Sequence, residues 1–398
     1  IDAMGERRIA DCFGSEFHRA AAHTLTPTIA SGRMRLLDDV TVFDPTGGPW
    51  KRGYLRANLA LSPDQWFFQG HFKNDPCMPG TLMLEGGLQA MQILMTALGH
   101  TLDHDGSRFE PVPEENYSLR CRGQATPASK EVVYEIFVEE IVGGAMPTIY
   151  ADILGSVDGR KAFHCKRMGL RLVPAWPLDE GRMQVEIPDD PRPVAVVDGF
   201  RFDYASLLAC AWGIPSSSFG PMYKRFDGTR RVARLPGPPY HFMSRVSHVS
   251  GPIGGMQVGS IAEIEYDVPA NEWYFTQNNA NAMPFPVLLE TALQPCGWLA
   301  SYVGGALDSE DNLYFRNLDG TGTQHVEIGP NIGTVKVPTK LTAVSKADAI
   351  VIMGFDVTMH AGTTLLYTLK TVFGFFPGDT MKDQAGLPMT PALRARVA

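Results

Sequence analysis

An internal duplication constrains the fold of this chain more than any other feature of its sequence. Three segments recur in the same order, namely Trp66-Phe67-Phe68, Met78-Pro79 and Leu82-Met83-Leu84-Glu85, then Trp273-Tyr274-Phe275, Met283-Pro284 and Val287-Leu288-Leu289-Glu290. The offset is 205 positions from Met78 to Met283 and 207 from Trp66 to Trp273, so the second copy lacks two residues in between. Such a repeat predicts two copies of one structural unit in the 398-residue chain.

Each copy is predicted to contain one long helix with a single buried stripe. Apolar residues recur every three or four positions in the first copy, at Leu84, Leu88, Met91, Met95 and Leu98. The positions 205 further on are also apolar or small, and they are Leu289, Leu293, Cys296, Ala300 and Val303. This spacing is typical of a helix that buries one face. Pro79 and Pro284 stand where each helix would begin.

The segments around these helices have the composition of strands. Residues 131–141 and 349–357 are rich in Val, Ile, Tyr and Phe with partial alternation, and we interpret the aromatic triplet 66–68 as a strand as well. One helix and several strands per copy predict an α+β protein of two modules, each an antiparallel sheet wrapped on its own helix. We expect the modules to pair by pseudo-twofold symmetry.

A proline-rich, acidic segment separates the two copies. Prolines at 174, 177, 188, 191 and 193 disfavour the interior of a helix or sheet, which predicts a linker. The expected organisation is an N-terminal extension (1–27), an N-terminal module (28–173), a proline-rich linker (174–227), a C-terminal module (228–378) and a tail (379–398). The chain begins at Ile1 without an initiator methionine, which favours a piece of a longer polypeptide with neighbouring domains.

Composition and charge exclude several classes of protein. Hydrophobic residues make up 44% of the chain and charged residues 20%, so it can bury a large core. The formal net charge of −8 disfavours a nucleic-acid binder. No apolar run reaches the roughly 18 residues that a membrane span needs. Six cysteines without CxxC spacing favour free thiols in a reducing, cytoplasmic setting.

One of the ten histidines lies in a context that suggests chemistry. His71 follows the aromatic triplet and precedes residues 75–80, a rigid turn into the first long helix. Its imidazole can exchange protons near neutral pH. Backbone N–H groups at the helix start, around Gly80, can hold an oxyanion, and glycine lets a carbonyl group approach closely. We interpret Cys77 as turn packing rather than as a nucleophile.

Each long helix also carries an acid among apolar residues. Glu85 and Glu290 are candidates for a general acid, because a half-buried carboxyl keeps its proton to a higher pH. Gln89 and Gln294 lie one turn further on, where their amides can orient the carboxyls. A capping or ion-pairing role for the two glutamates is the alternative. No motif in the sequence indicates a metal site or a nucleotide cofactor.

Two motifs resemble those of a known enzyme family. They are His71-Phe72 with Asp75-Pro76-Cys77-Met78-Pro79-Gly80-Thr81-Leu82-Met83, and Leu235-Pro236-Gly237-Pro238-Pro239-Tyr240-His241-Phe242-Met243. Both are similar to segments of the 3-hydroxydecanoyl-acyl carrier protein dehydratase family, in particular to dehydratase regions of polyunsaturated-fatty-acid synthases. The resemblance covers roughly residues 30–378. It implies a double hot-dog fold and the elimination of water from a 3-hydroxyacyl chain carried on the phosphopantetheine arm of acyl carrier protein.

The resemblance also implies a role for each candidate residue. His71 matches the family's catalytic histidine, and Gly80 matches the amide that binds the thioester carbonyl. The family's acid comes from the central helix of the partner module. Glu290 rather than Glu85 is therefore expected to face His71, with Gln294 as its orienting residue. No cofactor and no metal are implied.

A second, vestigial site is expected in the same chain. Its acid would be Glu85 with Gln89. Counting along the repeat puts Asn278 where the first copy has His71, and an amide cannot act as a general base. We therefore predict one working site per chain.

Two departures from the family pattern bear on these roles. The second helix begins with Phe285-Pro286 where the first has Gly80-Thr81, which weakens an oxyanion site there. Both acids are Glu where the bacterial single-module enzyme usually has Asp. The longer side chain moves the proton donor by about one methylene group.

The expected partners are acyl carrier protein and other synthase domains. The candidate docking surface is a basic patch at Lys224, Arg225, Arg230 and Arg231, for which ion pairs between domains or a solvated loop are the alternative interpretation. Two alternative functions remain open from the sequence. One is a hot-dog thioesterase, which activates water, and the other is a non-catalytic module that holds acyl chains.

Overall fold

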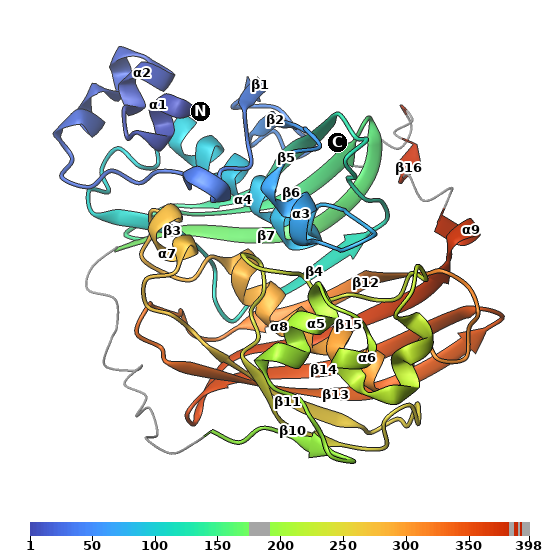
Figure 1. Ribbon diagram of the computed structural model, residues 1–398. Helices are drawn as coiled ribbons and strands as arrows, with labels where there is room; N and C mark the ends of the chain where they lie inside the picture. The colour runs from blue at the N-terminus through green and yellow to red at the C-terminus, as the bar shows by residue number, and fades with distance from the viewer. Residues whose placement is uncertain (175–191, 382–385, 389–390, 392–398) are drawn as a thin grey trace.

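A computed structural model of the protein describes residues 1–174, 192–381, 386–388 and 391. Two helices of 18 residues, α4 (Gly80–Ala97) and α8 (Phe285–Tyr302), lie side by side at its centre. Long strands curve around them in two halves, which Figure 1 shows in blue to green and in yellow to red. Both helices begin directly after a proline, Pro79 and Pro284, as the sequence predicts.

The strands of the two halves follow the same spatial order. In the first half this order is β1 (Asp39–Asp44), β2 (Tyr54–Ala60), β5 (Glu131–Val142), β6 (Thr148–Val157), β7 (Arg160–Pro174) and β4 (Asn116–Cys121). In the second half it is β10 (Arg245–Ser250), β11 (Ile261–Asp267), β13 (Thr334–Ala347), β14 (Ile350–Ala361), β15 (Thr364–Pro377) and β12 (Leu313–Gln324). β3 (Ser107–Pro111) and β16 (Leu387–Pro388) also pair with β7.

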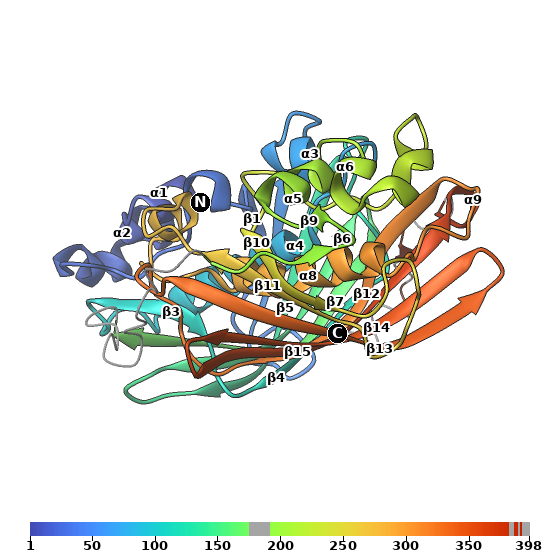
Figure 2. The same cartoon turned by 60° about the horizontal axis from the view of Figure 1, so that its bottom comes forward.

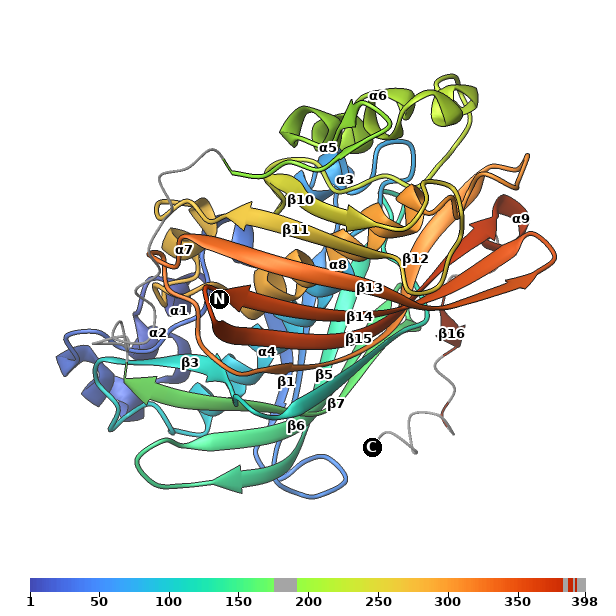
Figure 3. The same cartoon turned by 90° about the horizontal axis from the view of Figure 1, so that it is seen from below.

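The pairing of β4 with β12 joins the two halves into one continuous sheet. The two strands are antiparallel, with Ser118 opposite Thr321. Each half wraps around its own helix, and Figure 3 shows the strands from outside with α4 and α8 behind them. This architecture is an α+β double hot-dog, so the predicted fold class is confirmed.

The central helices are buried on nearly all sides. In α4, 15 of the 18 residues are buried, and in α8 16 are. The prediction of a single buried stripe is therefore wrong, because the sheet covers one side of each helix and the other helix covers part of the rest. Gly86 shows how close the packing is. A Cβ atom there would lie 2.3 Å from the ring of Tyr134 on β5.

The aromatic triplets lie in short helices and not in strands, which corrects a second expectation. These helices are α3 (Trp66–Gly70) and α7 (Trp273–Gln277). The rings of Trp66 and Trp273 meet edge to face with their centroids 5.4 Å apart. Tertiary packing between the two copies thus overrides the β propensity of three consecutive aromatic residues. α3 ends at the residue before His71.

Part of the predicted linker forms a packed layer. Residues 175–191 lie outside the described residues. After them come β8 (Val196–Val197), β9 (Phe200–Arg201), α5 (Tyr204–Ala211), α6 (Ser216–Phe219) and η4 (Pro221–Phe226). Figure 2 shows α5 and α6 on the side of α8 away from the sheet. Phe202 packs on Trp298 of α8, with ring centroids 5.2 Å apart. The domain limits themselves stay a prediction.

The remaining short helices lie near the ends of the two halves. They are α1 (Asp2–Gly5), α2 (Ile9–Phe13) and η1 (Ser15–Ala22) in the N-terminal extension, then η2 (Gly32–Met34) and α9 (Gly378–Met381). Met4 and Ile9 are buried in the main hydrophobic core, so the extension is packed against it. Among the residues described, no helix combines the length and the hydropathy needed to cross a bilayer.

Candidate active site

His71 is buried at the C-terminal end of α3, with its ring held by the turn that follows. Its Nδ1 lies 2.9 Å from the Cys77 carbonyl oxygen. A carbonyl oxygen only accepts hydrogen bonds, so Nδ1 carries the proton of the neutral ring and Nε2 keeps its lone pair. Burial lowers the pKa of His71 to about 3, and the positive charge of Arg316 acts in the same direction. At neutral pH this imidazole is therefore a neutral group that can accept a proton.

Glu290 is buried on α8 with both carboxyl oxygens hydrogen-bonded. The Thr81 hydroxyl donates to Oε2 at 2.9 Å, and the Gln294 amide donates to Oε1 at 3.3 Å. Burial raises the pKa of Glu290 to about 7, although both hydrogen bonds favour the ionised form. A large share of the molecules therefore keeps this carboxyl protonated at neutral pH, as a general acid requires.

Gln294 is fixed by backbone groups on both sides. Its Oε1 accepts from the Phe242 N–H at 2.8 Å, and its Nε2 donates to the Tyr240 carbonyl at 2.8 Å. The amide can therefore present an N–H to Glu290 in one orientation only. The structure brings the predicted orienting residue and the predicted acid together.

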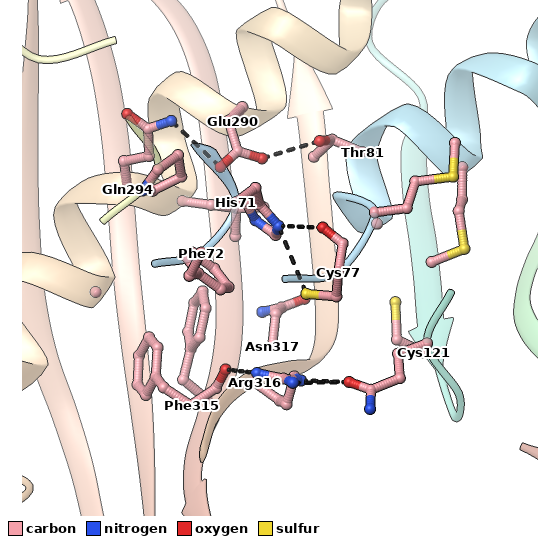
Figure 4. Close-up of a pocket in the computed structure, with 18 of the residues that line it drawn as sticks. His71, Phe72, Cys77, Thr81, Cys121, Glu290, Gln294, Phe315, Arg316 and Asn317 are labelled. Carbon is pink, nitrogen blue, oxygen red and sulfur yellow. Dashed lines mark hydrogen bonds between the residues drawn. The ribbon is translucent and has the colours of Figure 1, made fainter. Parts of the chain in front are cut away.

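His71, Gly80, Glu290 and Gln294 line one cavity between the two halves. It holds about 830 Å³ of empty space, part of it open to solvent. Figure 4 shows His71 and Glu290 in this cavity, one from each half of the chain. The wall is largely apolar and includes Leu119, Leu293, Phe315 and Phe373.

Gly80 is the first residue of α4, where backbone N–H groups have no partner within the helix. A Cβ atom on Gly80 would have as its nearest neighbour the Cys121 sulfur, at 3.5 Å. The glycine thus leaves the helix start open towards the cavity. A carbonyl oxygen in the cavity can reach this end of the helix, where the partial positive charge favours an oxyanion.

The three residues predicted for the second site also lie together. Glu85 and Asn278 line a separate cavity of about 490 Å³, and Gln89 donates to Glu85 at 2.8 Å. Asn278 Nδ2 donates to the Ala282 carbonyl at 3.0 Å, which matches the bond between His71 and Cys77 in the first site. Burial raises the pKa of Glu85 to about 7. The second cavity thus keeps an acid but has an amide where the first has an imidazole.

The second cavity differs further at the start of its helix. Phe285 and Pro286 occupy the places of Gly80 and Thr81. The Phe285 ring is buried, with its centroid 6.1 Å from that of Tyr117 and 6.2 Å from that of Tyr367. A large side chain thus stands at the helix start where the first site has glycine. Pro286 has neither an N–H nor a hydroxyl group to offer a ligand or the acid.

Sequence reasoning missed Thr81, Tyr240 and Arg316. Thr81 and Tyr240 lie inside the two recognised motifs. The bond of Thr81 to the acid and that of Tyr240 to Thr81 join residues far apart in the chain. Arg316 of β12 forms a two-point ion pair with Asp75, at 2.6 and 2.9 Å, and binds Gln124 as well. It therefore ties the second half to the turn that carries Cys77. No sequence pattern distinguishes it from other arginines.

Two further predictions concern the thiol of Cys77 and the absence of a metal site. Burial raises the pKa of the Cys77 thiol to about 11, so the thiolate is scarce at neutral pH. In the part of the chain that the structure describes, no three His, Cys, Asp or Glu side chains gather as a metal site would require. The absence of a metal and of a cofactor stays a prediction.

Most of the predicted basic patch is engaged within the chain. Arg225 donates to the Ser309 carbonyl at 3.2 Å, and Arg230 pairs with Glu310 at 3.3 Å. The Arg231 guanidinium lies over the Tyr314 ring, 4.2 Å from its centroid. Lys224 is exposed on η4.

Comparison with known proteins finds a family model that matches part of the chain. Residues 29–166 match the family described as FabA-like domain. The resemblance that the motifs predict is therefore confirmed. The chain is also 22% identical to one subunit of the polyunsaturated fatty acid synthase of Thraustochytrium sp. (strain ATCC 26185 / S-3), over 90% of this chain and 32% of that protein. It thus spans about a third of the length of this curated relative.

The solved structures that match the chain include dehydratases and thioesterases. The dehydratase domain from the CurJ module of curacin polyketide synthase matches with a TM-score of 0.46 and 11% identity, over 88% of this chain and all of that one. A putative oleoyl thioesterase from Lactobacillus plantarum matches with a TM-score of 0.43 and 10% identity, over 81% of this chain and 97% of the other.

Proposed function

We propose, from the match of residues 29–166 to the FabA-like domain family, that this chain is a 3-hydroxyacyl-acyl carrier protein dehydratase. It would convert a 3-hydroxyacyl thioester into a 2-enoyl thioester within a polyunsaturated-fatty-acid or polyketide-type synthase. The observation that carries the proposal is that His71 and Glu290, from opposite halves of the chain, line one largely apolar cavity. A neutral base and a protonated acid are the two groups that elimination of water requires.

In the proposed reaction the thioester carbonyl lies at the Gly80 N–H, which stabilises negative charge on its oxygen. His71 Nε2 removes a proton from C2, and the electrons of that C–H bond form the C2–C3 double bond. Glu290 gives its proton to the 3-hydroxyl group as the C3–O bond breaks, and water leaves.

The same two groups return to their starting state after each turnover. Elimination leaves a proton on His71 and a negative charge on Glu290. Because the pKa of His71 is about 3 and that of Glu290 about 7, transfer of the proton from the imidazole to the carboxylate is downhill. The resting pair is again a neutral base and a protonated acid.

The second cavity is inferred to be vestigial. Asn278 cannot accept a proton from carbon, and Phe285 blocks the approach of a carbonyl to the helix start. Glu85 and Gln89 then remain as a buried pair without a reaction partner. Each chain has one working site in this proposal.

Substitutions at the two glutamates test whether Glu290, and not Glu85, is the acid that acts with His71. His71→Ala and Glu290→Gln should each lower the rate of hydration of a crotonyl or decenoyl thioester by about 10²- to 10⁴-fold, the usual contribution of a general base or acid. Glu85→Gln is the matched control and should keep most of the activity. Equal losses in the two glutamate variants would contradict the pairing. Release of free thiol would indicate a thioesterase, and binding without turnover a module that only holds acyl chains.

We infer that acyl carrier protein and neighbouring synthase domains are the partners. The match to a synthase subunit about three times as long supports this inference. Of the basic patch, Lys224 is exposed and is the residue that we propose for docking. All six cysteines are free thiols, in agreement with the reducing, cytoplasmic setting that we infer from the sequence.

A further inference from the structure

We propose that Thr81 and Tyr240 are positioning residues that hold the Glu290 carboxyl in the orientation from which it donates its proton. This inference rests on the proposed dehydratase function. The Thr81 hydroxyl donates to Glu290 Oε2 at 2.9 Å, and the Tyr240 hydroxyl lies 2.9 Å from the Thr81 oxygen. Thr81 and Tyr240 are each only 2% exposed, so water does not substitute for these bonds.

Tyr240 is linked to both oxygens of the acid through Thr81 and Gln294. Its hydroxyl group acts on Oε2 through Thr81, and its carbonyl accepts from Gln294, whose amide donates to Oε1. The aromatic ring is itself held by Trp66, with centroids 5.7 Å apart, and by Phe242 at 4.9 Å. The carboxyl is thereby fixed by α4, by α8 and by the segment before β10.

The second cavity supplies an internal comparison. Gln89 is anchored in the same way as Gln294, since it accepts from the Leu36 N–H at 3.0 Å and donates to the Met34 carbonyl at 2.6 Å. Met34 therefore takes the place of Tyr240, and Pro286 takes the place of Thr81. The second cavity therefore forms without a counterpart of the Thr81 or the Tyr240 hydroxyl group. The hydroxyl pair accompanies only the cavity that has the imidazole, which points to a role in the reaction and not in folding.

The bond from Thr81 has a defined effect on the acid. A donor to the carboxylate stabilises the ionised form that remains after proton donation, so its removal raises the pKa of Glu290. The other titratable side chains around this carboxyl are His71, Cys77 and Tyr240, and the same cavity is lined by Arg234 and Arg316, which stay positively charged. Burial lowers the pKa of His71 and raises those of the thiol and the phenol, so all three stay neutral around pH 7. Titration of Glu290 itself therefore sets the pH profile in this range.

The test is the pH profile of kcat/KM for crotonyl-thioester hydration by the full chain. Thr81→Val should lower kcat/KM by about 10- to 100-fold, as expected for loss of a hydrogen bond to a charged group. The alkaline limb of the profile should move to higher pH, by about one pH unit. Thr81→Ser should restore both values, and Tyr240→Phe should shift the limb in the same direction by less.

The controls separate the possible failures. Thr96→Val removes another buried hydroxyl of α4, which bonds the Gln92 carbonyl, and should leave the profile unchanged. If Thr81→Val does not fold, Thr81→Ala and Tyr240→Phe give the same comparison. An unshifted limb in folded variants at Thr81 and Tyr240 would overturn the positioning role. A wild-type chain without hydratase activity would instead refute the proposed function.

Discussion

At the scale of single residues, two buried carboxyls with similarly raised pKa values have different surroundings. Glu290 receives hydrogen bonds from Thr81 and Gln294, whereas Glu85 receives one from Gln89. Burial alone therefore produces a protonated acid at both positions. The contacts around the carboxyl, and the imidazole across the cavity, distinguish the proposed working acid from the vestigial one.

The pH dependence of the wild-type chain follows from the same residues. Activity requires neutral His71 and protonated Glu290. Since the pKa of His71 is about 3 and that of Glu290 about 7, kcat/KM should be flat in mild acid and fall above about pH 7, tenfold per pH unit. Steady-state hydration rates across this range check the expectation. An activity that rises through pH 7 would mean that an ionised group, such as a carboxylate base, drives the reaction.

At the scale of elements, the start of each central helix decides what its cavity can hold. α4 begins with glycine and leaves an opening, while α8 begins with Phe285. An apolar space of about 390 Å³ lies between the two helices and the sheet, and it shares Leu119, Leu293 and Asn317 with the active cavity. Phe285 lines this space and also the second cavity, so its ring separates the two.

Shortening Phe285 should therefore change the preferred acyl chain length. Phe285→Ala would join the apolar space to the second cavity, and kcat/KM should rise for the longest enoyl thioesters, by about fourfold per additional buried methylene group. A chain-length series of substrates measures this effect. Phe219→Ala removes a buried ring in the layer over α8 and serves as the control, because it should destabilise without altering the series. An identical chain-length profile in both variants would argue against the ring as the barrier between the apolar space and the second cavity.

At the scale of the whole molecule, the active cavity depends on contact between the halves. β4 pairs with β12, α4 packs on α8, and Arg316 reaches from the second half to Asp75 in the first. The turn that holds Asp75 also supplies the Cys77 carbonyl that fixes the His71 ring. The ion pair therefore connects the association of the halves with the orientation of the base.

Removal of Arg316 should weaken both stability and activity. Arg316→Met leaves Asp75 without its buried partner and should lower the free energy of unfolding by about 3 kcal/mol. Hydratase activity should fall too, since the turn around His71 loosens. Arg167→Met breaks an exposed pair with Glu139 and should cost less than about 1 kcal/mol. Urea unfolding of both variants makes the comparison, and equal small losses would contradict the proposed connection.

The sequence by itself determined the features that depend on local pattern or on the repeat. The spacing of Leu84 and its successors, together with Pro79, placed α4, and the 205-residue offset then placed α8. Alignment of the copies pairs Asn278 with His71, and Asn278 forms the backbone contact that corresponds to that of His71. These predictions succeed because helix periodicity and internal homology are properties of neighbouring or repeated residues.

Only the tertiary structure decided the features that depend on contacts between distant residues. The aromatic triplets form helices because Trp66 packs on Trp273, and α4 is buried on nearly all sides because the sheet and α8 enclose it. The bonds of Thr81 to Glu290 and Tyr240 join positions 209 and 159 residues apart. Such pairs cannot be predicted from local sequence patterns. The partner of a side chain at that separation depends on the path of the folded chain and on the exclusion of water from the cavity.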